Sequence, residues 1–222
     1  RFRRYGLYVS SPGRLVTLSN CRIGTDITGT VDLGNGSNGI YLTGGFTEPD
    51  LKSFIAPDFH HLHYSAQDYF RLRNVISGNG GNGIRVTNGH RVHIYGHYIG
   101  TDSSGLHDLG NDENGILFTG GSGVVGDIKP SDFVAEDGTS MRRTVISGND
   151  QNGVKISDSA RNVTVNGNYI GTTSNGNGPL GNSQNGVFVT TVDAENDLGL
   201  ITMEFGAPTG NVISANGENG VK

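Results

Sequence analysis

One histidine-rich stretch has the residue types needed to bind a transition metal. His61 and His63 would share a face if this segment formed a strand, and Asp58 lies close by in the sequence. Two imidazoles and a carboxylate suit a transition metal. The pattern therefore predicts a metal site at His61, His63 and Asp58. The alternative is a surface loop whose aromatic residues pack on the rest of the protein.

Acidic side chains recur in the motif Ile-Gly-Thr-Asp, where Asp26 and Asp102 occupy matching positions and Thr173 replaces the acid in a third copy. Carboxylates in register favour calcium as a candidate cofactor. The local carboxylates Asp108, Asp112 and Glu113 offer a second, weaker calcium site. The alternative is that these acids only stabilise turns.

Aromatic residues and glycosylation motifs suggest contact with sugars. Tyr64, Tyr69 and Tyr95 are candidates for stacking against a glycan, because aromatic rings combine an apolar face with a polar edge. Two Asn-x-Ser/Thr motifs, at Asn35 and Asn162, make these residues candidate glycosylation sites in a secreted protein. Polysaccharide is therefore a candidate partner.

No motif predicts a catalytic centre. The acids and arginines of segment 124–143 form no recognisable pair, and the separation that glycoside hydrolysis requires cannot be read from sequence. The glycines do not stand between a strand and a helix, as phosphate-binding loops do. We therefore assign no catalytic residues.

The chain is organised by a repeat, Asn-Gly-apolar-x-apolar, which begins at residues 38, 82, 114, 152 and 185 and again at Asn219. An imperfect copy begins at Tyr5. Two unit types alternate, each with three short stretches of strand-like alternation. Three inserts break the pattern, near 47–73, 124–143 and 191–210.

Stacking of these units would align equivalent apolar residues in three columns, as in a solenoid of parallel strands. The first column is Leu7, Ile40, Ile84, Ile116, Val154, Val187 and Val221; the second is Val9, Leu42, Val86, Phe118, Ile156 and Val189; the third is Ile23, Ile76, Ile99, Ile146, Ile170 and Ile213. We expect the Asn-Gly pairs to form sharp corners, where both residues tolerate positive φ. Corner asparagines could also bond to one another as stacked amide ladders.

Four segments carry a resemblance to a known group of proteins. Asn152-Gly-Val-Lys-Ile, Gly167-Asn-Tyr-Ile-Gly-Thr, Leu180-Gly-Asn and Thr144-Val-Ile-Ser-Gly-Asn resemble the right-handed parallel β-helix repeat proteins of bacteria and some algae. The resemblance covers nearly the whole chain. It implies an all-β, right-handed parallel β-helix with loop inserts, in about six coils of two alternating types. It also implies an extracellular or cell-surface location.

We expect residues 1–222 to form a single β-helix domain that is part of a longer repeat chain, because both ends fall within a unit. Open strand edges there favour self-association or neighbouring subunits as partners. The 37 glycines lack the collagen spacing, and no apolar run could span a membrane. A net charge of −5 without a basic face disfavours nucleic acid.

Two functions from different classes remain open. We favour a non-enzymatic extracellular structural or adhesive protein, such as a filament, surface-layer or matrix component, that presents loops for assembly or glycan contact. The alternative is a carbohydrate-active enzyme, a polysaccharide lyase or epimerase, with its site on a sheet face beside the inserts. The β-helix fold hosts both classes, so the fold alone does not decide between them.

Overall fold

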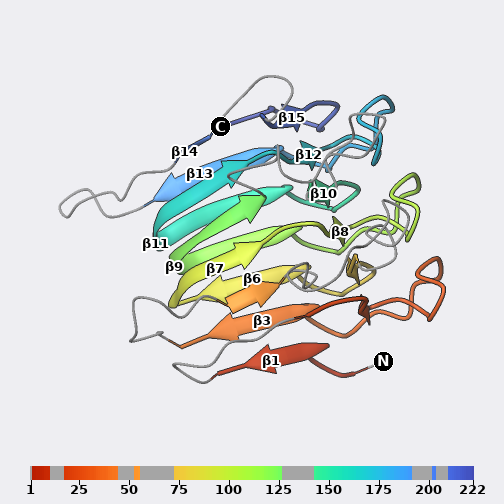
Figure 1. Cartoon of the computed structure of the whole chain (residues 1–222), viewed down its shortest axis with the longest axis horizontal. Coiled ribbons are helices and arrows are strands. Elements are labelled where there is room, and N and C mark those ends of the chain that lie inside the picture. Colours follow the sequence, from red (N-terminus) through yellow and green to blue (C-terminus); the bar gives the residue numbers. More distant parts are fainter. Residues whose placement is uncertain are drawn as a thin grey trace, which may run out of the picture.

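A computed structural model describes residues 2–10, 18–44, 53–55, 73–126, 143–191, 202–203 and 210–222. The regular elements in these ranges are all β-strands, without any helix. It follows that this part of the chain holds no helix able to cross a membrane. The strands pair in parallel and stack from β1 at one end to β13 and β15 at the other, in a solenoid-like arrangement (Figure 1).

The first sheet has nine strands, six of which form a continuous path in the order β1-β3-β6-β9-β11-β13. These six are β1 (Leu7–Val9), β3 (Ile40–Thr43), β6 (Ile84–Thr87), β9 (Ile116–Gly126), β11 (Val154–Asn166) and β13 (Val187–Thr191). Three further strands, β4 (Ser53–Ile55), β7 (Gly89–Ile94) and β14 (Thr202–Met203), pair beside this path.

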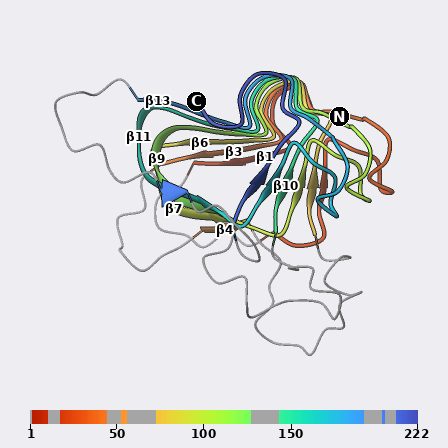
Figure 2. The same cartoon turned by 90° about the horizontal axis from the view of Figure 1, so that it is seen from above.

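The second sheet has six strands of two residues each, in the order β15-β12-β10-β8-β5-β2. They are β2 (Arg22–Ile23), β5 (Val75–Ile76), β8 (Tyr98–Ile99), β10 (Val145–Ile146), β12 (Tyr169–Ile170) and β15 (Val212–Ile213). The six strands of the continuous path therefore alternate along the chain with the six strands of the second sheet. Seen along the stack, equivalent strands superpose (Figure 2).

The strand register confirms the three predicted apolar columns. Ile40 pairs with Ile84, and Ile84 pairs with Ile116 in the first column. Ile99 and Ile146 are register partners in the third. The side chains at the centre of all three columns are fully buried and belong to one core. Alternate residues point outward, because successive side chains of a strand face opposite sides.

Two strands of the first sheet are longer than their neighbours, β9 with 11 residues and β11 with 13. The second half of β9 lies between β7 and the second half of β11, so that Val92, Gly123 and Val163 share one register position. Register shifts in β11 mark bulges, which let the strand bend. Because β9 ends at Gly126, residues 124–126 of the second expected insert belong to this strand.

The Asn-Gly corners work differently from our prediction of positive φ. In the described ranges, no asparagine or glycine of these pairs has a positive φ; other glycines do, such as Gly100. A Cβ on Gly83 would lie 2.8 Å from Ile99 Cγ2 and 2.7 Å from the carbonyl oxygen of Gly115. Glycine is needed there because the two sheets approach too closely for a side chain.

Asparagines form two continuous amide ladders, as we predicted for the corners, and all are buried except Asn216 and Asn219 at the C-terminal end. The first ladder is Asn35, Asn79, Asn111, Asn149, Asn182 and Asn216, and the second is Asn38, Asn82, Asn114, Asn152, Asn185 and Asn219. In the first, each Nδ2 donates toward the C-terminal end, as Asn79 does to Asn111 Oδ1 at 2.9 Å. In the second, each Nδ2 donates toward the N-terminal end.

Candidate functional site

The outward face of the first sheet carries a line of aromatic and cationic side chains. They lie between the first and second apolar columns, one per strand, and their register is continuous from β1 to β13. The line consists of Tyr8, Tyr41, Arg85, Leu117, Lys155 and Phe188. We call these six residues the aromatic–cationic stripe. Their outward orientation follows from strand alternation, because the neighbours on both sides of each point into the core.

Aromatic rings gather at the β1 end of the stripe. The centroids of Tyr8 and Tyr41 lie 5.4 Å apart. Tyr5 stacks on Tyr8 with 5.6 Å between the centroids and meets Tyr41 in a tilted contact at 5.1 Å. The guanidinium of Arg85 lies over Tyr41, 5.4 Å from the ring centroid. This is the distance of a cation–π contact, which holds the charge beside the aromatic cluster.

The β13 end of the stripe also combines cations with an aromatic ring. Lys155 Nζ lies 5.7 Å from the centroid of Phe188, and Lys222 Nζ lies 5.6 Å from the same centroid. Leu117 stands between Arg85 and Lys155 in the register. The stripe therefore has an aromatic group at each end, with two positive charges and an apolar residue between them.

Among the described residues, no acid forms an ion pair with the cations of the stripe. The one ion pair in that part of the chain is His107 with Asp102, in the connection between β8 and β9. Arg85 and Lys155 have no carboxylate partner there, and Arg85 Nε is buried without a hydrogen bond. In a protein of net charge −5, the stripe is thus a local positive feature.

Threonine hydroxyls lie next to the stripe on the same face. Thr43 is the register partner of Thr87, and Thr87 Oγ1 lies 2.8 Å from Thr119 Oγ1. A hydroxyl both donates and accepts hydrogen bonds. Aromatic faces, cations and hydroxyls together can stack on, pair with and hydrogen-bond an extended polar ligand.

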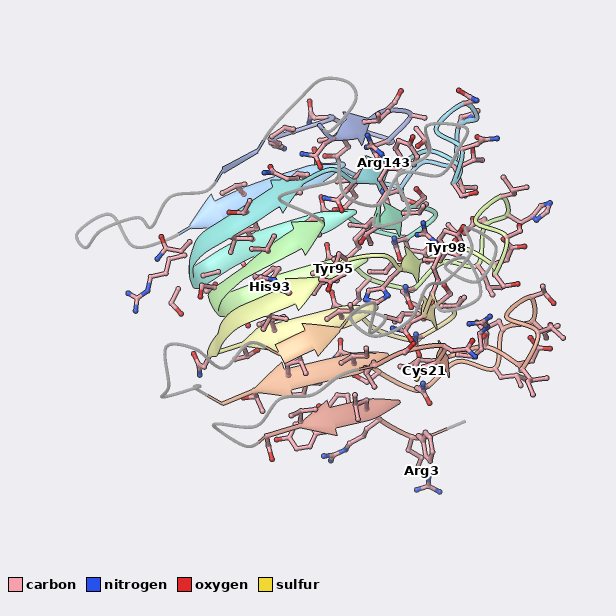
Figure 3. The ribbon with its side chains drawn as sticks, viewed as in Figure 1. Arg3, Cys21, His93, Tyr95, Tyr98 and Arg143 are labelled. Atoms are coloured by element: carbon pink, nitrogen blue, oxygen red, sulfur yellow. The ribbon has the colours of Figure 1, made fainter. Side chains whose placement is uncertain are left out.

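Two buried arginines lie on the outer side of the second sheet, beside the ends of two expected inserts. Arg73 Nη1 donates to the carbonyl oxygen of Arg143 at 2.6 Å, and Arg143 Nη1 donates to that of Gly210 at 2.9 Å. Arg73 lies over Tyr98 and Arg143 over Tyr169, with 5.0 and 4.6 Å to the ring centroids. Figure 3 shows Tyr98 and Arg143 beside the short strands.

Burial lowers the pKa of Arg73 and of Arg143, because the guanidinium loses water. Each bond to a backbone carbonyl links units that are two apart in the stack. These contacts link every second unit of the stack along the outer side of the second sheet.

The acids of the Ile-Gly-Thr-Asp motif bond within their own loops. Asp26 accepts hydrogen bonds from Thr28 Oγ1 and from the backbone N–H of Thr30 and Val31. The Thr28 hydroxyl, and then the backbone donors, lower the pKa of Asp26 to about 2. This arrangement is typical of a turn-forming aspartate.

Asp102 repeats this pattern, accepting from Ser104 Oγ at 2.7 Å and from His107 Nδ1 at 3.0 Å. Burial acts to raise its pKa, but these hydrogen bonds outweigh it, and the pKa is lowered. The two loops stack on one another, because Ser103 N–H donates to the Gly29 carbonyl oxygen.

The other acids proposed for calcium, Asp108 and Glu113, also have hydrogen-bond partners within the protein. Asp108 Oδ1 accepts from the N–H of Gly110, and Glu113 Oε2 accepts from the second-ladder residue Asn82. Asp112 lines a depression of about 450 Å³ together with Asp32 and glycine backbone. Among the described residues, no group of three or more His, Cys, Asp or Glu side chains is arranged to hold a metal. Calcium binding stays a prediction.

Most residues proposed from the sequence as binding sites lie outside the described ranges. These are the metal candidates His61, His63 and Asp58, and the aromatic candidates Tyr64 and Tyr69. Tyr95 is half-buried directly after β7, as Figure 3 shows. It lies outside the aromatic–cationic stripe. Glycan contact by Tyr64, Tyr69 and Tyr95 stays a prediction.

The two candidate glycosylation sites have contrasting surroundings. Asn35 is 6% exposed, and its Nδ2 donates to Asn79 Oδ1 in the first ladder. Asn162 is exposed in β11, with a positive φ of 51°. A glycan on Asn35 would require its amide to leave the ladder, whereas Asn162 is accessible in the folded protein. Glycosylation stays a prediction at both.

Our sequence analysis missed the stripe as a site. Its signal was available, because each member is the residue between two column positions, as Arg85 is between Ile84 and Val86. Reading that intermediate position down the repeats gives the aromatic residues at the two ends and the cations between them directly.

Comparisons with known proteins gave no match. No family model matches the chain, and neither a curated protein nor a solved structure is similar to it.

Proposed function

We propose that this chain is a non-enzymatic extracellular structural or adhesive protein that presents its outer surface for assembly or glycan contact. The underlying architecture is a right-handed parallel β-helix of about six coils, in two alternating coil types, with loop inserts. The right hand is the one that nearly all parallel crossovers adopt. An extracellular or cell-surface location is part of the same proposal.

The observation that carries the proposal is the uniform use of buried polar groups in the two asparagine ladders. Asn149, for example, is fully buried and bonds to Asn111 on one side and to Asn182 on the other. A catalytic site needs polar groups that differ in role and pKa. The ladders instead repeat one amide in one role, which favours a scaffold.

A second candidate is a carbohydrate-active enzyme, favoured by Arg73 and Arg143 beside the inserts. Their lowered pKa values are the kind of perturbation found at functional sites, although structural contacts also produce it. Both guanidiniums already donate to backbone carbonyls, which supports the structural role.

Native size and shape provide the test. Light scattering and negative-stain imaging of the purified protein should reveal filaments, regular arrays or end-to-end assemblies. A compact, monodisperse monomer that shortens a uronic polysaccharide would contradict the structural proposal and favour the enzyme.

A further inference from the structure

The aromatic–cationic stripe has the form of a binding track for a linear polymer. It presents one side chain per strand, and neighbouring parallel strands lie about 4.8 Å apart. Its register is uninterrupted over six strands, from Tyr8 to Phe188. A ligand that lies across the strands would therefore meet contacts at equal intervals. This interval is comparable to the length of a sugar ring.

The chemistry of these contacts selects an acidic sugar polymer. Tyr8, Tyr41 and Phe188 offer ring faces, on which the apolar face of a sugar can stack. Arg85 and Lys155 offer positive charge without a carboxylate partner in the described part of the chain. Arginine and lysine both pair with carboxylates or sulfates, and arginine does so with two parallel hydrogen bonds.

The cations are also positioned before any ligand arrives. The Arg85 guanidinium lies 5.4 Å from the Tyr41 centroid, and Lys155 Nζ lies 5.7 Å from that of Phe188. Contacts of this kind reduce the side-chain freedom that binding would otherwise remove. The hydroxyls of Thr87 and Thr119 stand on the same face, within reach of sugar hydroxyls.

A nucleic acid is a poorer occupant, because a protein of net charge −5 repels a densely charged polyanion outside the stripe. A second copy of the chain would bring like charges together at Arg85 and Lys155 unless it docked in a shifted register.

We propose that the aromatic–cationic stripe binds an acidic polysaccharide that runs along the stack, perpendicular to the strands. The stripe's own cations supply the charge, so binding needs no calcium. The inference deepens the adhesive function proposed above and rests on it.

The test uses the whole protein and two probes, polygalacturonate and the neutral polymer dextran, in affinity electrophoresis with a calcium chelator present. Polygalacturonate should retard the protein more than dextran does, and added salt should weaken the retardation because it screens exposed charges.

Variants of the stripe give the decisive comparison. R85Q/K155Q removes two charges and keeps side chains of similar size, and we expect it to weaken binding to polygalacturonate about tenfold. R3Q/R161Q is the matched charge control, since Arg3 and Arg161 are two exposed cations outside the stripe. Y41A/F188A should also weaken binding, whereas I27A, at an exposed loop residue, should not. Circular dichroism of each variant verifies folding.

Three results would overturn the proposal: equal retardation of R85Q/K155Q and R3Q/R161Q, retention that requires calcium, or no retardation of the unaltered protein. Concentration-dependent self-association that is lost in R85Q/K155Q would assign the stripe to a contact between copies instead. The chain length of the recovered polygalacturonate reports separately on the proposed function. Intact polymer without retardation contradicts only the stripe assignment, and shortened polymer contradicts the non-enzymatic function.

Discussion

The ring of Phe118 packs against Gly123 of the same strand, in the space next to which a side chain at position 123 would stand. A Cβ on Gly123 would come within 3.2 Å of Phe118 Cε1 and 2.5 Å of the Val92 carbonyl oxygen. Gly123 shares its register position with Val92 and Val163, so a glycine stands where the neighbouring strands have valine. The one aromatic residue in the aliphatic columns is thus accommodated by a missing side chain five positions later.

This pairing predicts a large effect of truncating the ring. Phe118→Ala should lower the free energy of unfolding by about 3–5 kcal/mol, because Gly123 has nothing to fill the cavity. Phe118→Leu should cost clearly less. Urea denaturation followed by circular dichroism measures both, with Leu106→Ala, at a 44% exposed loop residue, as control. A loss for Phe118→Ala no larger than for the control would contradict this packing.

Breaking the first amide ladder should also be costly. Asn149→Ala removes the acceptor of Asn111 Nδ2 and the donor to Asn182 Oδ1, which lie at 2.9 and 2.8 Å. Asn111 Nδ2 keeps its bond to the Ile76 carbonyl oxygen, and Asn182 Oδ1 keeps its bond from the backbone N–H of residue 149. The loss of two buried hydrogen bonds should therefore cost about 1–3 kcal/mol in unfolding free energy. Asn177→Ala, in an exposed loop, is the matched change. If the two variants have the same midpoint of thermal unfolding, the ladder does not stabilise the fold.

Glycine is required at Gly100, where φ is +85° and a Cβ would lie 2.2 Å from the Ser147 carbonyl oxygen. We expect Gly100→Ala to destabilise the protein by at least about 2 kcal/mol, from backbone strain and from the clash. Gly220→Ala should be tolerated, since the nearest heavy atom would be 3.7 Å away. Comparable unfolding free energies for the two variants would refute the argument.

The Asp26 loop should respond to acid. Its carboxyl pKa is lowered from 3.8 to about 2, so the folded loop favours the charged form. The stabilisation of the loop is therefore complete above pH 3.8 and is lost as pH falls toward 2. NMR spectra of the Thr30 and Val31 amides should shift in that interval, and Asp26→Asn should abolish the titration. Amide shifts that persist in Asp26→Asn would assign the response to another group.

The repeat made much of the architecture predictable. The spacing of Asn-Gly pairs placed Ile84 and Ile99 in their columns, because a parallel stack leaves only one register that buries every aliphatic residue. The bend of β9 and β11 was not predictable, since the glycines at 120, 121 and 123 read as an ordinary loop signal. The opposed directions of the two ladders depend on side-chain rotamers, which the sequence does not encode locally.

The candidate site was harder to predict from the sequence than the fold. We searched the inserts around His61 and Tyr64 for chemistry, because loops usually carry function. The stripe instead consists of Tyr41, Arg85 and similar residues scattered over the repeats, which become neighbours only through the strand register.

The most direct test of the proposed function is the chain length of an acidic polysaccharide after prolonged incubation with the protein. Size-exclusion chromatography of polygalacturonate, with and without calcium, should give an unchanged polymer profile, as expected for a protein without catalytic turnover. Shortened polymer that persists through purification, and that disappears in Arg143→Gln, would contradict the non-enzymatic function and identify an enzyme with its site at the second sheet.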